Sequence, residues 1–364
     1  MNSTDENNLY YVTSGPVKII SDEALALISV VLKSALYEFC SVVGITTNCL
    51  NLVVFWKIGF KDTVNVSLFA IAVSDACSLI SLFWMSVCYN PLFANSDIII
   101  DSRGVQYLTG GWPKFYFTRV SAMITAYVTF ERCLCTAMPL KVKAILTPKR
   151  VLVIVSAIYI GLALSISPIY LATTLDWKFY PGRNKTLVGL IFSANKETIN
   201  SISIGLNVVL CNGSFIFVTV NTLILVCNIN KSMQFKESFA KVTGKKISKE
   251  TKASKMVILT AGVFIVCLFP SSLVTLGMVI FPSFNAGEAQ GNLFFTLASV
   301  IHISEAINAS LNILVYVHMS SKFKQTFTET FACFRHLVMR KSSAKVYKKE
   351  LTVSVSTVSV QNNK

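Results

Sequence analysis

Ionisable side chains stand inside stretches of sequence that are otherwise apolar. Lys114 and Arg119 lie in one such stretch, and His302 and Glu305 lie in another. A charged group in hydrocarbon is costly unless it is paired or hydrated, so each of these residues needs a partner or a ligand. The chemistry that they offer is recognition of charge. The two cations attract an acidic group, such as a carboxylate or a peptide C-terminus, and Glu305 and His302 complete a polar pocket.

The depth of these residues can be judged from helical rise. Arg119 precedes Arg132 by thirteen residues and Glu305 precedes Tyr316 by eleven, which at 1.5 Å per residue gives about 20 Å and about 16 Å from the same boundary. We therefore hypothesise that Arg119 and Glu305 share a polar pocket, with His302 one turn from Glu305 on the same face. In the alternative, Arg119 bonds carbonyl groups of the fourth and fifth apolar stretches and faces away from Glu305.

The elements that hold these side chains must lie in a membrane. Of the 364 residues, 53% are hydrophobic and 14% are charged, whereas a soluble domain carries about 25% charged residues. This composition excludes an ordinary soluble enzyme. The net charge of +15 lies in short loops and in the tail rather than on a polar face, so nucleic acid is not expected as a partner.

Seven apolar stretches have about the 20 residues that a helix needs to cross a bilayer. The third is the weakest, because Lys114 and Arg119 interrupt it, but the other six alternate correctly only if it is included. The sequence therefore predicts an all-α membrane protein, a seven-transmembrane helix bundle whose termini lie on opposite sides. The stretches are 30–56, 64–88, 107–136, 150–172, 199–228, 254–281 and 293–317.

The distribution of Lys and Arg predicts the orientation. If the first, third and fifth connections and the tail are cytoplasmic, they hold 24 of the 33 Lys and Arg residues, so the N-terminus is expected outside. The polar start of the chain lacks the pattern of a cleavable signal peptide. Glycosylation is predicted at Asn2 and Asn184, which then lie outside.

The cysteines indicate neither a disulfide nor a metal site. All ten lie in apolar stretches or on the predicted cytoplasmic side, and the three histidines are scattered. We therefore predict no extracellular disulfide and no metal centre. Trp112 and Trp177 are expected to mark the outer interface of the membrane rather than the pocket.

Further polar residues form five short motifs in successive stretches. Together, in this order and over about residues 44–333, they resemble the rhodopsin-like (class A) G-protein-coupled receptors. The motifs are Gly44-Ile-Thr-Thr-Asn48, Leu68-Phe-Ala-Ile-Ala-Val-Ser-Asp75, Glu131-Arg132-Cys133 followed by Pro139-Leu140, Cys267-Leu-Phe-Pro270 and Asn312-Ile-Leu-Val-Tyr316.

The resemblance implies two internal sites. The first is a polar core that surrounds a sodium ion or a water cluster; apart from this ion, no cofactor is expected. The second is an activation switch at the cytoplasmic end, in which Arg132 pairs with Glu131 and with Glu250 until an agonist releases it to a heterotrimeric G protein. The polar core comprises Asn48, Asp75, Asn308 and Asn312, and the switch comprises Glu131, Arg132, Glu250, Pro270, Asn312 and Tyr316.

Residues outside the seven stretches form three further segments around the receptor domain of 30–317. Residues 1–29 are predicted to be extracellular. Residues 318–336 space their aromatic side chains by four and predict an amphipathic helix on the membrane surface, where Cys333 is a candidate for palmitoylation. Residues 337–364 are predicted to be a disordered cytoplasmic tail, a candidate for phosphorylation by a receptor kinase and for binding arrestin.

Departures from the family pattern exclude two classes of ligand. Lys114 stands where an amine receptor has an aspartate, and Ala306 where an opsin has its lysine, so the chain is expected to be neither. The first intracellular connections resemble those of molluscan chemosensory and peptide-type receptors. The sequence thus predicts a plasma-membrane receptor for an extracellular chemical cue that performs no covalent chemistry. A neuropeptide receptor is the alternative, and a transporter or channel is the alternative from another class.

Overall fold

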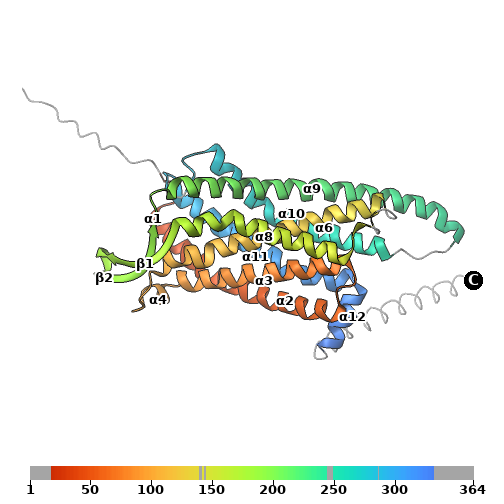
Figure 1. Ribbon diagram of the computed structural model, residues 1–364, viewed down its shortest axis with the longest axis horizontal. Helices are drawn as coiled ribbons and strands as arrows, with labels where there is room; N and C mark the ends of the chain where they lie inside the picture. Colours follow the sequence, from red (N-terminus) through yellow and green to blue (C-terminus); the bar gives the residue numbers. More distant parts are fainter. Residues whose placement is uncertain (1–17, 139–141, 143–144, 244–248, 286, 332–364) are drawn as a thin grey trace, which may run out of the picture.

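The computed structural model describes residues 18–138, 142, 145–243, 249–285 and 287–331, with side chains for all of these except 232–252. Seven long helical segments lie side by side, and a β-hairpin and a short helix project from opposite ends (Figure 1). We call these ends the hairpin end and the α12 end. The segments are Asp22–Ile58 (α1 Asp22–Ser29, η1 Val30–Leu36, α2 Tyr37–Ile58), α3 Thr63–Tyr89, α6 Trp112–Ala137, α8 Pro148–Ala172, α9 Lys196–Thr243, α10 Lys249–Ile280 and α11 Gly291–Met319.

Six of these segments are long and apolar enough to cross a membrane, and α6 is the one that is not. The reason lies in its position. It packs against α3, α8, α9 and α10, and its charged residues Lys114, Arg119, Glu131 and Arg132 are all buried. Because its neighbours shield α6 from lipid, it can carry polar side chains that a lipid-facing helix could not.

Two segments extend beyond the predicted stretches. The first helical segment begins at Asp22 rather than at residue 30, because Ser21 caps it by accepting a hydrogen bond from the Ala24 amide. The fifth, α9, continues to Thr243. Apolar patterning therefore located these helices but not their ends.

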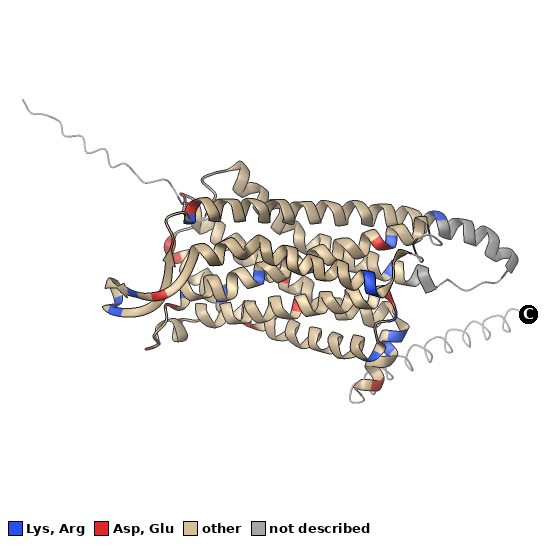
Figure 2. Ribbon diagram, viewed as in Figure 1, with Lys and Arg blue, Asp and Glu red and all other residues tan. Residues whose placement is uncertain are grey.

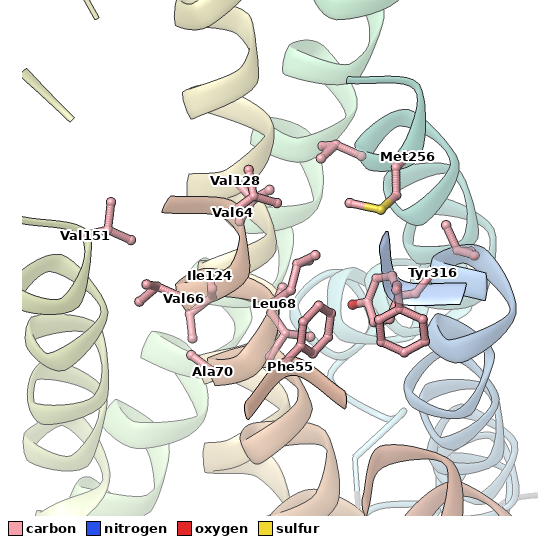
Figure 3. Packing of buried hydrophobic residues seen from close by; sticks show 14 of the residues in the cluster. Phe55, Val64, Val66, Leu68, Ala70, Ile124, Val128, Val151, Met256 and Tyr316 are labelled. Carbon is pink, nitrogen blue, oxygen red and sulfur yellow. The ribbon is translucent and has the colours of Figure 1, made fainter. Parts of the chain in front are cut away.

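Close packing of small residues holds the first helices together. A Cβ atom on Gly44 would lie 2.5 Å from Ser310 Oγ and 2.7 Å from a methyl group of Leu79. Glycine therefore lets α2 approach α3 and α11 at this level, as small residues commonly do between membrane helices. A larger apolar cluster fills the α12 half, where the ring of Phe55 meets that of Tyr316 with centroids 5.2 Å apart (Figure 3).

The connections at the hairpin end contain the strands. Strand β1 (Thr173–Tyr180) pairs antiparallel with β2 (Lys185–Phe192). The short helix η3 (Pro181–Arg183) connects the two strands. The connection from α3 to α6 runs through α4 (Pro91–Ala94), α5 (Ser102–Gln106) and η2 (Tyr107–Gly111). This hairpin was not predicted from the sequence.

The hairpin is tied to the preceding connection without a covalent bond. The Val188 amide donates to the Ile99 carbonyl (2.7 Å), and the Asp101 amide donates to the Val188 carbonyl (2.8 Å). The Tyr180 hydroxyl donates to Asp101 Oδ2 (3.1 Å), and burial together with the Asp101 carboxylate raises the pKa of Tyr180. A Cβ atom on Gly189 would lie 2.0 Å from the Tyr180 hydroxyl, so any other residue there would force the Tyr180 side chain to move.

Helix α12 (Ser321–Thr330) follows α11 and lies within the segment predicted to be amphipathic. Its Phe323 and Phe327 side chains are buried, and the ring of Phe323 packs at a tilt against that of Phe55, with centroids 5.1 Å apart. Lys and Arg gather around this end of the bundle (Figure 2). Of the predicted segments 1–29, 318–336 and 337–364, residues 1–17 and 332–364 lie outside the described residues.

Candidate functional site

Glu305 on α11 lies at the centre of a buried ionic cluster in the hairpin half of the bundle. It forms ion pairs with Lys114 of α6, through Oε2, and with Arg119 of α6, through Oε1 at 3.3 Å. Ser271 of α10 lies 3.5 Å from Oε1, and His302 Nδ1 lies 3.4 Å from Oε2. The structure thus brings together all four residues of the predicted pocket and joins three helices through one carboxylate.

Helical periodicity explains the α11 side of the cluster, because His302 and Glu305 are one turn apart. Lys114 and Arg119 are five residues apart on α6, and both long side chains reach Glu305. Aromatic rings fix the imidazole, since Tyr37 and Phe115 contact it edge-on at 5.9 and 5.6 Å between centroids. The cluster is therefore preorganised for binding charge.

Buried cations outnumber buried carboxylates in this region. Lys114 and Arg119 share the single carboxylate of Glu305, and Lys33 of η1 is also buried. Its ammonium lies over the rings of Tyr89, at 4.7 Å, and of Phe295, at 5.4 Å. Sequence reasoning missed Lys33 as a site residue, although a lysine inside an apolar stretch is itself the signal that would have found it.

Arg119 uses only part of its guanidinium. Nη2 bonds Glu305, but Nε and Nη1 are buried and have no hydrogen-bond partner among the described residues. A small cavity between α6, α8 and α9 lies beside this side chain and is also lined by Trp112. Trp112 is buried, so the expectation that it marks the membrane interface is wrong. Trp177, on the hairpin, is exposed.

A second polar network lies deeper in the bundle, around Asp75 of α3. Its carboxylate accepts hydrogen bonds from Ser121 Oγ (2.7 Å) and Asn312 Nδ2 (2.8 Å). Asn48 Nδ2 donates instead to the carbonyls of Gly44 and Ala309. The structure therefore joins Asp75 to Asn312 as predicted, adds Ser121, which sequence reasoning missed, and leaves half-buried Asn308 outside this network.

At the α12 end, Arg132 pairs with its neighbour Glu131 at 2.5 Å, and Glu131 also accepts a hydrogen bond from Thr63 of α3 at 2.6 Å. Both charged residues line a cavity of about 910 Å³, together with Met256 and Tyr316. The Glu250 side chain, the predicted second partner of Arg132, lies outside the described side chains.

Pro270 lies inside α10, where it removes one backbone hydrogen bond. Close to it, the Cys267 carbonyl accepts a hydrogen bond from Ser304 of α11 at 2.6 Å. Tyr316 is buried against Phe55 and Phe323. Of the predicted switch residues, Glu131, Arg132 and Tyr316 line the cavity at the α12 end, whereas Pro270 directly precedes Ser271 of the ionic cluster.

Of the three predicted modification sites, the structure describes only Asn184. Asn184 is exposed at the tip of the hairpin, with a left-handed backbone (φ 47°). Asn2 and Cys333 lie outside the described residues. Among the residues that the structure does describe, no cysteine forms a disulfide, and no group of three or more candidate ligands could hold a metal ion.

Comparison with known proteins agrees with this architecture. The chain is 23% identical over 323 residues to galanin receptor 2a of Danio rerio, an alignment that covers 85% of this chain and 81% of that receptor. Residues 49–316 match the family described as 7 transmembrane receptor (rhodopsin family). This range includes five of the seven helical segments in full, α11 except for its last three residues, and the last ten residues of the first segment. The predictions of a seven-helix membrane bundle and of this family are therefore confirmed: the chain belongs to the rhodopsin family of seven-transmembrane receptors.

Proposed function

We propose that this receptor binds an extracellular ligand carrying an acidic group and activates a heterotrimeric G protein. The observation that carries the proposal is the buried cluster in which Lys114 and Arg119 share the one carboxylate of Glu305. A ligand carboxylate would restore the balance of charge, and charge-assisted hydrogen bonds to Lys and Arg are among the strongest that a site can offer.

The cluster can transmit binding because Glu305 contacts two other helices. A ligand carboxylate that binds Lys114 would remove one of the partners of Glu305. The contacts of α11 with α6, and with α10 through Ser271, would then change. Pro270 follows directly before Ser271 and gives α10 a point at which it can bend. The resulting shift can be no larger than the difference in ligand affinity between the two states.

The α12 end supplies the second half of the proposal. The cavity of about 910 Å³ is lined by Arg132 and by residues of α3, α10 and α11, so movement of α10 would change its shape. In the resting arrangement Arg132 is held by Glu131. Release of Arg132 into this cavity would offer a cation to a G protein that enters from the cytoplasm.

A sodium ion is proposed for the network around Asp75. The donor set fits, because a buried carboxylate and the Ser121 hydroxyl offer the hard oxygen atoms that such cations prefer. The buried Oδ1 of Asn48 has no hydrogen-bond partner among the described residues. The ion would supply positive charge opposite Asp75, while these side chains keep α3, α6 and α11 together.

Two classes of ligand are consistent with an acidic group. A chemosensory cue is the class suggested by the sequence. A peptide is favoured by one specific observation, the similarity to a receptor named for galanin, and a peptide would offer its C-terminal carboxylate. A transporter or channel would leave the Glu131–Arg132 pair beside the large cavity without a role.

The remaining parts of the proposal concern location and regulation. We place the receptor in the plasma membrane with the hairpin end outside, in keeping with the Lys and Arg residues at the α12 end (Figure 2). Palmitoylation of Cys333, and phosphorylation of the tail by a receptor kinase with arrestin binding, remain proposals for segments outside the described residues.

The test is a ligand screen that reads G-protein dissociation in cells. The probes are small carboxylic acids and peptides, each paired with its own amide so that only the acidic group differs. We expect responses to the free acids, no response to the matched amides, and no response from an Arg132→Ala receptor present at the same surface density. Equal responses to acids and amides would refute the acidic-ligand proposal, and responses that persist in Arg132→Ala would refute the proposed switch.

A further inference from the structure

Part of the Arg119 guanidinium has no hydrogen-bond partner among the described residues, and Arg119 lines a small polar cavity. Arg119 is 4% exposed, and the atoms without a partner are its buried Nε and Nη1. Cys211 of α9 also interacts with this side chain, but a thiol is only a weak acceptor. Leaving buried donors of a charged group unpaired is costly.

The cavity beside Arg119 has room for one small occupant. Its volume is about 20 Å³, which exceeds the ~10–15 Å³ needed for a single water-sized particle and is far too small for a ligand molecule. The polar side chains that line it come from three helices. They are Trp112, Tyr116 and Arg119 of α6, Ser165 of α8, and Ser203 and Asn207 of α9.

Charge decides which occupant suits the site. Arg119 and Lys114 bring two positive charges to the single carboxylate of Glu305, and the lining of the cavity contains no acidic residue. The lining does contain neutral donors, since Asn207 offers an amide and Ser203, one turn before it, offers a hydroxyl. Donors around a surplus cation select an anion over a cation.

We propose that this cavity, between α6, α8 and α9, binds a single chloride-sized anion on Arg119 Nε and Nη1. The anion neutralises the surplus charge of the ionic cluster and joins the three helices. It occupies a different side of Arg119 from Glu305, so the site does not depend on the acidic-ligand function. Bromide fits by the same chemistry, whereas gluconate is excluded by size.

The test measures the thermal unfolding midpoint (Tm) of the purified full-length receptor in lipid nanodiscs. Chloride or bromide replaces gluconate stepwise, so that the sodium concentration and the ionic strength stay constant. We expect Tm to rise saturably with chloride and with bromide, and to stay low in gluconate. An equal Tm in all three salts would overturn the proposal and leave water as the occupant.

Variants locate the effect. Asn207→Leu removes one donor and should weaken apparent chloride affinity about tenfold, the value of one charge-assisted hydrogen bond. Ser203→Asp supplies a resident carboxylate and should make Tm high and independent of chloride. Ser201→Asp, two residues away on the exposed face of α9, is the matched control and should keep the chloride response. If Ser203→Asp and Ser201→Asp respond to chloride alike, the anion does not bind in this cavity.

Discussion

Glu305 neutralises side chains that come from a different helix and lie far away in the sequence. Glu305 is 5% exposed and Lys114 is 1% exposed, so water cannot solvate either charge if the other is removed. Breaking a buried ion pair by removing one partner costs about 3–5 kcal/mol, because the other partner keeps its charge. The Lys114–Glu305 pair should therefore dominate the stability of the hairpin half.

Glu305→Gln should lower the Tm of the purified receptor strongly, because it leaves Lys114 and Arg119 without a counter-charge. Lys114→Met should cost less, since Arg119 then still pairs with Glu305. In a double-mutant cycle, Lys114→Met should recover part of the loss caused by Glu305→Gln. Glu38→Gln, at an exposed position on α2, is the control. Strictly additive effects would mean that the two residues do not interact.

Asp75 allows a separate prediction about cations. With chloride held constant, replacing choline by sodium should raise the Tm of the wild-type receptor, and Asp75→Asn should abolish this rise because the ion loses its charged ligand. Repeating the measurement with potassium in place of sodium tests whether the rise in Tm depends on the size of the cation. A sodium effect of the same size in Asp75→Asn would remove the ion from this network.

Arithmetic on the sequence led to the hypothesis that Arg119 and Glu305 share a pocket, because helical rise fixes the depth of a residue in a bundle, but it left open whether the two side chains pair. It could not predict Ser271 as a further partner, since a serine in an apolar helix costs little and carries no signal. Lys33 and the free N–H groups of Arg119 depend on which way each side chain turns. That direction is set by tertiary packing, which one sequence does not reveal.

Among the elements, the β-hairpin shows how a loop is fixed without a disulfide. Its contacts with the 99–101 segment are main-chain hydrogen bonds and the bond from Tyr180 to Asp101. Lys185 also forms an ion pair with Asp97, which lowers the pKa of that carboxyl; the pair is exposed, so we assign it little weight. Strand patterning was too weak in this segment to predict the hairpin, whereas apolar length sufficed for the helices.

Val188→Pro should loosen the hairpin, because proline cannot donate the bond from the Val188 amide to Ile99. Thr186→Pro is the matched control. It lies two residues away on the same strand, so its amide points to the same side but makes no such bond. Hydrogen exchange of the 99–101 amides should increase in Val188→Pro and not in Thr186→Pro. Equal exchange in both would mean that this bond does not hold the loop.

For the whole molecule, the orientation remains a prediction that topology mapping can decide. An epitope tag at the N-terminus should bind antibody on intact cells, and a tag at the C-terminus should bind only after permeabilisation, because seven spans separate the two ends. Asn184→Gln should remove a glycan and increase gel mobility, since Asn184 is exposed at the hairpin end. Finding both tags on the same side of the membrane would contradict the prediction that seven spans separate the two termini.

The polar character of α6 has a consequence for how the chain is made. Glu305 follows Lys114 by 191 residues, so the ribosome finishes α6 long before it produces the counter-charge. A nascent chain that ends before α11 offers the translocon a third segment with unpaired lysine and arginine, which is a poor candidate for release into lipid. Biogenesis of this receptor therefore requires α6 to be sheltered by the translocon, by a chaperone or by its earlier neighbours until the seventh span arrives.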